Sequence, residues 1–249
     1  MKGQGQTIVL FASWSIAAAV SLALASILSG FGTRWGWWGF RTGLSLLRWT
    51  VYGEIAVMLV SLSGMMLASH RGARGAPLLY LIAFLISISA AIVPVRHGMT
   101  ARSVPPIHDI TTDPDHPPVF SAVAPLRGDE ANPIDYGGPA VAEQQRKGYP
   151  DLEPALLDLP PRQAFDAALA AARDMGWEIV DANPGQGRIE ATDTTFWFGF
   201  KDDVVIRVAP TETGSRVDVR SLSRVGRSDV GTNAKRIRVF LAALTGRSS

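Results

Sequence analysis

Cysteine is missing from the 249-residue chain. Its absence excludes disulfides, thiolate nucleophiles and metal–thiolate sites, but it leaves the compartment open, because many exported domains fold without disulfides. Histidine is also scarce, and only His108 and His116 follow the apolar first hundred residues. A net charge of +2 and a pI of 9.1 are too mild to indicate a nucleic-acid partner. The composition therefore predicts no nucleic-acid binding and limits the available acid–base chemistry.

Charge is absent from Gly3 to Thr33, whereas soluble domains carry a charge at about every fourth residue. Within this stretch, residues 7–30 are long enough as a helix to cross a hydrocarbon core of about 30 Å. Two more candidate spans cover about residues 49–69 and 77–95, and a short basic turn at residues 70–74 joins them into an antiparallel hairpin. Residues 1–100 are therefore predicted to be a transmembrane region with three spans, and the lipid bilayer is a predicted partner.

Two features of the spans have alternative interpretations. Lys2, the apolar run and the small residues around Ala23 and Ala25 also fit a cleavable signal peptide, although two further spans follow it. Glu54 is the only acidic residue inside a span, and an intramembrane carboxylate is by default a candidate functional group. Because Glu54 lies five residues past Trp49, the favoured interpretation is a solvated side chain near the interface.

The orientation of the chain is predicted with the N-terminus in the cytoplasm, which places the C-terminal domain on the periplasmic side of a bacterial inner membrane. Cleavage of the first span would not change this location. The distribution of basic residues opposes the choice, with three on the cytoplasmic side (Lys2, Arg71, Arg74) against five outside (Arg34, Arg41, Arg48, Arg96, Arg102). Arg41 and Arg48 count weakly, because their stretch is typical of an interfacial segment. A reporter active only in the periplasm, fused after Ser249, tests the orientation: silence of that fusion while a cytoplasmic reporter works would contradict it.

Residues 101–160 form a proline-rich arm that cannot be a long helix or a central strand. The arm carries more apolar residues than a disordered tether would, so it is expected to lie partly over the domain. These apolar residues are Ile107, Ile110, Val119, Phe120 and Tyr136.

Residues 161–249 are predicted to be a soluble α+β domain. A helix from Pro161 is closed by Gly176, and alternating apolar residues then predict about four strands with short turns between them. A last helix is expected from about Asp229, its N-cap, to Thr245, with Gly246 as its stop. The predicted fold is an antiparallel meander of about four strands covered by two helices.

The C-terminal block resembles the domain-of-unknown-function 1499 family. The resemblance rests on the Asp193–Arg207 stretch, on the run Arg-Ser-x-Ser-Arg-x-Gly-x-Ser-Asp-x-Gly-x-Asn from Arg220 to Asn233, and on Ile107–Asp113, so that it covers about residues 107–244. It implies a bacterial or plastid protein, often placed behind an export signal or membrane spans, and no established activity.

The strongest candidate for a binding site is the basic stretch near the C-terminus. Serines and glycines lead into a helix N-terminus, where free amides favour an anion, and the arginines could add bidentate contacts to a phosphate or carboxylate. The alternative is that Arg220 and Arg224 pair with Asp202, Asp203 or Asp229 and hold the loop. The candidate ligand-binding residues are Arg220, Ser221, Ser223, Arg224, Ser228, Asp229, Asn233 and Arg236.

Secondary candidates lie at the start of the arm, where His108, Asp109, Asp113, Asp115 and His116 have the residue types of a metal site. Their spacing matches no ligand motif, so no metal and no cofactor are predicted. A serine nucleophile is not favoured, because no G-x-S-x-G elbow is present.

Another tract is aromatic: residues 196–200 are expected in the sheet core rather than as a ligand platform.

The favoured function is a non-enzymatic envelope module that binds an anionic small molecule, a lipid headgroup or a protein partner. One alternative is a hydrolase or transferase acting on an anionic substrate, with His108 and Asp109 as acid and base. Another is a structural scaffold in a membrane complex, which requires Arg220 and Arg224 to be fully engaged with acids.

Overall fold

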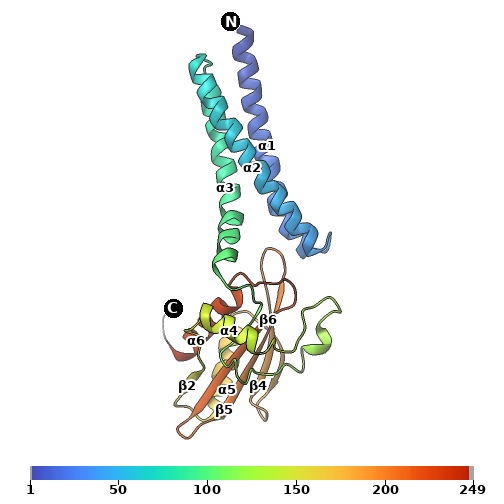
Figure 1. The fold of residues 1–249 in the computed structure, drawn as a ribbon, viewed down its shortest axis with the longest axis vertical. Helices are drawn as coiled ribbons and strands as arrows, with labels where there is room; N and C mark the ends of the chain where they lie inside the picture. The colour runs from blue at the N-terminus through green and yellow to red at the C-terminus, as the bar shows by residue number, and fades with distance from the viewer. Residues whose placement is uncertain (1, 247–249) are drawn as a thin grey trace. The chain divides into compact units, whose positions relative to one another are not determined.

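The computed structural model describes residues 2–246 and divides into two compact units. One unit holds residues 1–99 with 197–199, and the other holds residues 100–196 with 200–249. Three helices dominate the first unit: α1 (Lys2–Arg34), α2 (Phe40–His70) and α3 (Ala76–Ser103), as Figure 1 shows. All three are long and apolar enough to cross a membrane, so the three predicted apolar helices are confirmed. Each helix extends beyond its predicted span.

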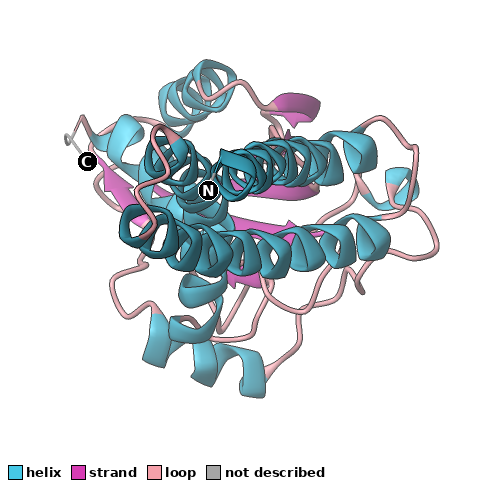
Figure 2. Cartoon of the chain, turned by 90° about the horizontal axis from the view of Figure 1, so that it is seen from above, coloured by secondary structure: helices cyan, strands magenta, loops and turns pink. Residues whose placement is uncertain are grey.

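Small residues line the contacts among these helices. The buried positions of α3 recur at three- and four-residue spacing and include Ala76, Ala83, Ser87 and Ala91. Helices α1 and α2 lie side by side (Figures 1 and 2), and Gly53 of α2 meets the Leu22 side chain. Membrane helices approach closely through such residues, since lipid gives no hydrophobic drive for their association.

The second unit contains one six-stranded antiparallel sheet. Its strands are β1 (Asp109–Thr111), β2 (Ala155–Leu157), β3 (Glu178–Asn183), β4 (Arg188–Thr194), β5 (Lys201–Pro210) and β6 (Ser215–Ser223). The order is β1-β6-β5-β4-β3, and β2 also pairs with β6. The predicted meander is confirmed as β3 to β6. The arm adds β1 and β2, which have three residues each and are too short for an alternating apolar pattern to be recognised in the sequence.

A tight turn between β3 and β4 depends on Gly187. Its φ of 61° is left-handed, and a Cβ there would overlap the carbonyl oxygen of Val208. Gly187 can therefore sit against β5, where its carbonyl accepts a hydrogen bond of 2.7 Å from the Val208 N–H.

Two helices cover one face of the sheet, as the sequence predicts. Helix α5 (Pro161–Asp174) and helix α6 (Thr232–Thr245) pack their apolar sides on the inner residues of β4, β5 and β6. In this core the rings of Trp177 and Phe240 stack with centroids 5.4 Å apart. Helix α6 ends at Gly246, whose φ of 66° is typical of a left-handed C-cap.

The arm covers the opposite face. Phe120 and Val123 are buried there against Val205 and Leu222, in a small second core. Besides its two strands, the arm forms a 3-10 turn at Ala124–Leu126 and helix α4 (Pro139–Gly148). Ile107 and Ile110 are buried as expected, whereas Val119 is 74% exposed. The arm is thus a structural layer of the second unit.

Two expectations need correction. The aromatic tract is not in the sheet core: it forms the loop from β4 to β5, closed by a 2.8 Å hydrogen bond from the Thr195 N–H to the Phe200 carbonyl, and Phe196 is 78% exposed. Gly199 has a φ of 68°, a left-handed conformation that is incompatible with an extended strand, so the tract cannot continue β4 into β5. The last helix begins at Thr232 and not at Asp229, because Val230 and Gly231 adopt left-handed backbone.

Candidate functional site

The predicted site residues are divided between the two faces of the sheet. Successive side chains of a strand point to opposite faces. In β6, Arg220 therefore lies on the face that the arm covers, while Ser221 and Ser223 lie on the face that α5 and α6 cover. The eight predicted ligand-binding residues do not form one site.

On the arm face, Arg220 is the central side chain and is 3% exposed. Its Nε and Nη2 donate to the two carboxylate oxygens of Asp109 at 2.9 and 2.8 Å. It also donates to the carbonyls of Pro118 at 3.1 Å and Ile134 at 2.7 Å. Arg220 therefore joins β6, β1 and two points of the arm.

Aromatic rings complete the surroundings of Arg220. The guanidinium carbon lies 5.0 Å from the Phe120 ring centre and 5.5 Å from that of Tyr136. Burial, and then the nearby Asp109 carboxylate, raise the pKa of Tyr136 to about 12. The Tyr136 phenol thus stays neutral at physiological pH, and Arg220 has no open side for an added anion.

Arg224 has a similar role beside the arm. Its Nε and Nη2 donate to Asp203 at 3.0 and 2.8 Å, and its Nη1 donates to the carbonyl of Leu126 at 3.0 Å. Arg127 of the arm also pairs with Asp203, which additionally accepts from the Thr192 hydroxyl at 2.9 Å. Asp203 therefore forms ion pairs with two arginines, Arg127 and Arg224. The Arg224–Asp203 pair is one of the pairings that the alternative interpretation of the sequence predicted.

Two further acids of the arm face were missed in the sequence. Glu190 is fully buried and accepts from the backbone N–H groups of Ser121 and Val123, each at 2.9 Å. Asp218 is also fully buried and binds Arg207 and Arg216 at 2.9 Å. Glu190 lies in β4 and Asp218 in β6, each between two apolar residues that face the other side of the sheet, and this is the signal that could have found them.

On the helix face, α6 is fastened to the sheet by polar contacts. Arg236 lies 2.6 Å from Asp202 and 2.7 Å from Asp193, and its Nη1 donates to the Ser221 hydroxyl at 3.0 Å. Asn233 accepts from the Ser221 hydroxyl at 2.8 Å and donates to the Ser223 hydroxyl at 3.0 Å. These candidate residues are all buried and mutually bonded.

Side chains of the loop before α6 accept hydrogen bonds from the free N–H groups at the N-terminus of that helix. Asp229 accepts from the N–H groups of Asn233 at 2.6 Å and Gly231 at 3.0 Å, and Ser228 accepts from the Val230 N–H at 3.2 Å. Burial raises the pKa of Asp229, while the hydrogen bonds from the two N–H groups oppose that effect. The position in which a bound anion was expected is thus taken by the Asp229 carboxylate.

Two basic side chains near this loop remain exposed: Arg227 and Lys235. Neither makes an ion pair within residues 2–246. The loop that carries Arg227 is held against the first residues of the arm, since the Asp229 N–H donates to the Ile107 carbonyl at 3.2 Å. Arg227 and Lys235 are therefore the cations of this region that are open to a ligand.

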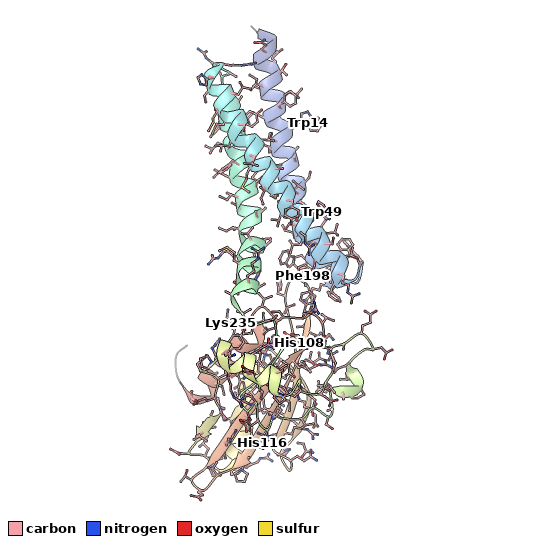
Figure 3. The ribbon with its side chains drawn as sticks, viewed as in Figure 1. Trp14, Trp49, His108, His116, Phe198 and Lys235 are labelled. Atoms are coloured by element: carbon pink, nitrogen blue, oxygen red, sulfur yellow. The ribbon has the colours of Figure 1, made fainter. Side chains whose placement is uncertain are left out.

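The secondary candidates do not converge. His108 and His116 lie at opposite ends of the domain in Figure 3. Asp113 pairs with Arg207 and Arg216 at 2.9 Å. Asp109 is buried against Arg220, and no group of three or more metal-ligating side chains occurs in the described part of the chain. The arrangement offers no shared acid–base pair.

Together, the three apolar helices and the arm-covered sheet define a membrane-anchored α+β domain protein. The chain belongs to the family described as protein of unknown function (DUF1499), whose model matches residues 109–244, more than half of the chain. The predicted family resemblance is confirmed. No curated protein matches the chain.

Proposed function

We propose that the protein is a non-enzymatic module of the cell envelope that binds phosphate-bearing anionic headgroups of its own membrane. Arg227 and Lys235 make the contacts, together with Arg102 at the end of α3. The single observation that carries the proposal is that Arg227 and Lys235 are exposed and unpaired among the described residues. The motif arginines, Arg220, Arg224 and Arg236, are instead paired with carboxylates.

The motif arginines support the proposal by exclusion. Arg220, Arg224 and Arg236 each contact at least one carboxylate within 2.8 Å. An added anion would have to displace these buried carboxylates, which would leave them unpaired at high cost. A ligand is therefore expected at the side chains that have no acid beside them.

Covalent connection supports the membrane as the source of the anion. Arg96 is the first charged residue after the apolar part of α3. From Arg96 to the end of the helix at Ser103 is about 10 Å. The Arg227 loop is bonded to Ile107 and His108, only a few residues further along. At this range a basic side chain gains about 1 kcal/mol from an anionic leaflet, and the gain falls within a Debye length.

A structural role in a membrane complex is the second candidate function. It required Arg220 and Arg224 to be engaged with acids, and Asp109 and Asp203 meet that requirement. The enzymatic alternative has weaker support, because both carboxylate oxygens of Asp109 already accept from Arg220. The proposed location remains the periplasmic side of a bacterial inner membrane, and the reporter fusion after Ser249 tests it.

The test is native mass spectrometry of the full-length protein released from mixed phosphatidylglycerol and phosphatidylcholine vesicles. We expect the wild type to retain phosphatidylglycerol preferentially, and the Arg227→Ser/Lys235→Ser variant to lose most of that preference. The matched control is Lys147→Ser/Arg173→Ser, which removes the same charge at other exposed positions.

A second arm adds inorganic phosphate to protein in phosphatidylcholine alone. Phosphate adducts that require Arg227 would identify a soluble anion as the ligand. Equal retention of phosphatidylglycerol by both variants would contradict the proposal and leave the structural role.

A further inference from the structure

Glu54 lies at the middle of α2 and is 1% exposed within the unit of three helices. The expectation of a solvated side chain near the interface is therefore wrong. Helix α2 starts nine residues before Trp49, so the position of Trp49 does not mark the helix end. Glu54 faces the interior of the helical unit.

The depth of Glu54 follows from its neighbour on α3. The Ser87 hydroxyl of α3 lies close to the Glu54 carboxyl, but the two groups do not meet the geometry of a hydrogen bond. Ser87 lies 11 residues after Ala76, the first residue of α3, and nine before Arg96, which is about 16 Å and about 14 Å of helix. It is therefore near the centre of the apolar part of α3, and Glu54 is at the same depth.

The apolar parts of the three helices contain no basic residue that could neutralise the Glu54 carboxylate. Helix α1 has no charged residue from Gly3 to Thr33, and α3 has none from Ala76 to Val95. On α2 itself the nearest charge is Arg48, six residues away, or about 9 Å along the axis. An ionised carboxylate without a partner in such an environment is strongly disfavoured, and the usual outcome is that it becomes neutral.

The hydroxyls around Glu54 differ from the other hydroxyls of the helices. Ser15, Ser29 and Thr50 each donate to a carbonyl of their own helix at 2.7–3.0 Å. Ser61 and Ser87 are fully buried, and neither hydroxyl has a hydrogen-bond partner among the described residues; the same is true of both carboxylate oxygens of Glu54. Ser61 is two turns from Glu54 on the same side of α2. Three buried polar side chains thus lie inside the membrane region with unused bonding capacity.

We propose that Glu54 is an intramembrane proton-binding site, in which the carboxyl carries a proton and donates it in a hydrogen bond to the Ser87 hydroxyl. A proton is the occupant that fits, because it neutralises the carboxylate without the roughly six or more oxygen ligands that cations such as Mg²⁺ and Ca²⁺ require. This site is independent of headgroup binding by the C-terminal domain.

The test uses full-length protein in vesicles and dicyclohexylcarbodiimide, an apolar reagent for protonated carboxyls. The carboxyl O–H adds across one C=N bond, the proton goes to nitrogen, and the adduct rearranges to a stable acylurea with no atom lost. Peptide mass spectrometry locates the label. We expect Glu54 to be labelled by this reagent and not by a water-soluble carbodiimide, which should label exposed acids such as Glu143.

Two variants make the result specific. Glu54→Gln keeps the shape of the side chain, and we expect it to lack both the label and the infrared carbonyl band of a buried carboxylic acid. Ser87→Ala should keep the label and shift that band, because the proton loses its acceptor.

Sodium ions that abolish labelling at constant pH would assign the site to a metal cation and overturn the proposal. A folded wild type with neither the label nor the band at acidic pH would overturn it as well.

Discussion

At the scale of single residues, the arm face of the sheet is held by buried ion pairs rather than by apolar contact alone. Arg220 with Asp109 is one of these enclosed pairs, and both side chains are at most 6% exposed. Moving two charges out of water costs several kcal/mol each, so such a pair is not in itself a large net gain. Its bidentate geometry and its two backbone acceptors instead specify where β1 and the arm lie.

Loss of one partner of this pair is expected to be severe. We predict that Asp109→Asn lowers the free energy of unfolding of the domain by about 3–5 kcal/mol, because the buried Arg220 is left without its counter-charge. Pulse proteolysis of the full-length protein in urea measures this directly.

The matched control is Glu143→Gln, whose pair with Lys147 is exposed and i,i+4, so a loss of about 0.5 kcal/mol or less is expected. Equal effects of the two substitutions would show that the Arg220 pair does not organise the arm.

The residue scale is also where the sequence was least predictive. The run from Arg220 to Asn233 could be recognised as unusual, but not which acid each arginine meets. Asp109 lies 111 positions from Arg220, and that contact exists only because β1 pairs with β6. Successive side chains of β6 point to opposite faces of the sheet, so Arg220 and Ser221 lie on different faces and one ligand cannot contact both.

At the scale of elements, the spacing of apolar residues predicts the helices and the central hairpins. The residues at which an element begins or ends depend instead on hydrogen bonds from nearby side chains. The start of α6 shows the difference, because Asp229 does cap the helix but does so from two residues before the N-cap position of Gly231. Val230 keeps a left-handed φ of 53° in between, which is unfavourable for a β-branched residue. Neither feature is visible in hydrophobic spacing.

Asp229 should make the domain sensitive to pH. Burial raises its folded pKa above the unfolded value of 3.8, and the nearby Asp202 adds to this effect. The stability that its neutral form contributes is therefore complete below that unfolded pKa and is lost as pH rises through the folded pKa. Asp229→Asn keeps an acceptor oxygen and cannot ionise, so its thermal midpoint should fall less than that of the wild type over this window.

The companion variant separates charge from capping. Asp229→Ala removes the acceptor as well and should lose about 1–2 kcal/mol at every pH, measured by the same pulse proteolysis. If wild type and Asp229→Asn follow identical pH profiles, burial does not perturb this carboxyl.

At the scale of the whole molecule, the sequence predicted a membrane region followed by one α+β domain, because charge-free runs and alternating strands are both local signals. It did not predict that the arm is a layer of the second unit, since that depends on long-range pairing of β1 and β2 with β6. The same pairing brings the Arg227 loop to Ile107 and His108, which closely follow α3. The proposed binding of headgroups is therefore a property of the assembled chain.

Amide hydrogen exchange of the 224–232 loop, with the full-length protein in lipid nanodiscs, tests this proposed function most directly. We predict slower exchange of the loop in phosphatidylglycerol than in phosphatidylcholine, with the difference lost at high salt and in the Arg227→Ser/Lys235→Ser variant, while the 183–187 turn is unchanged in both lipids. Identical exchange of the loop in the two lipids at low salt would contradict headgroup binding.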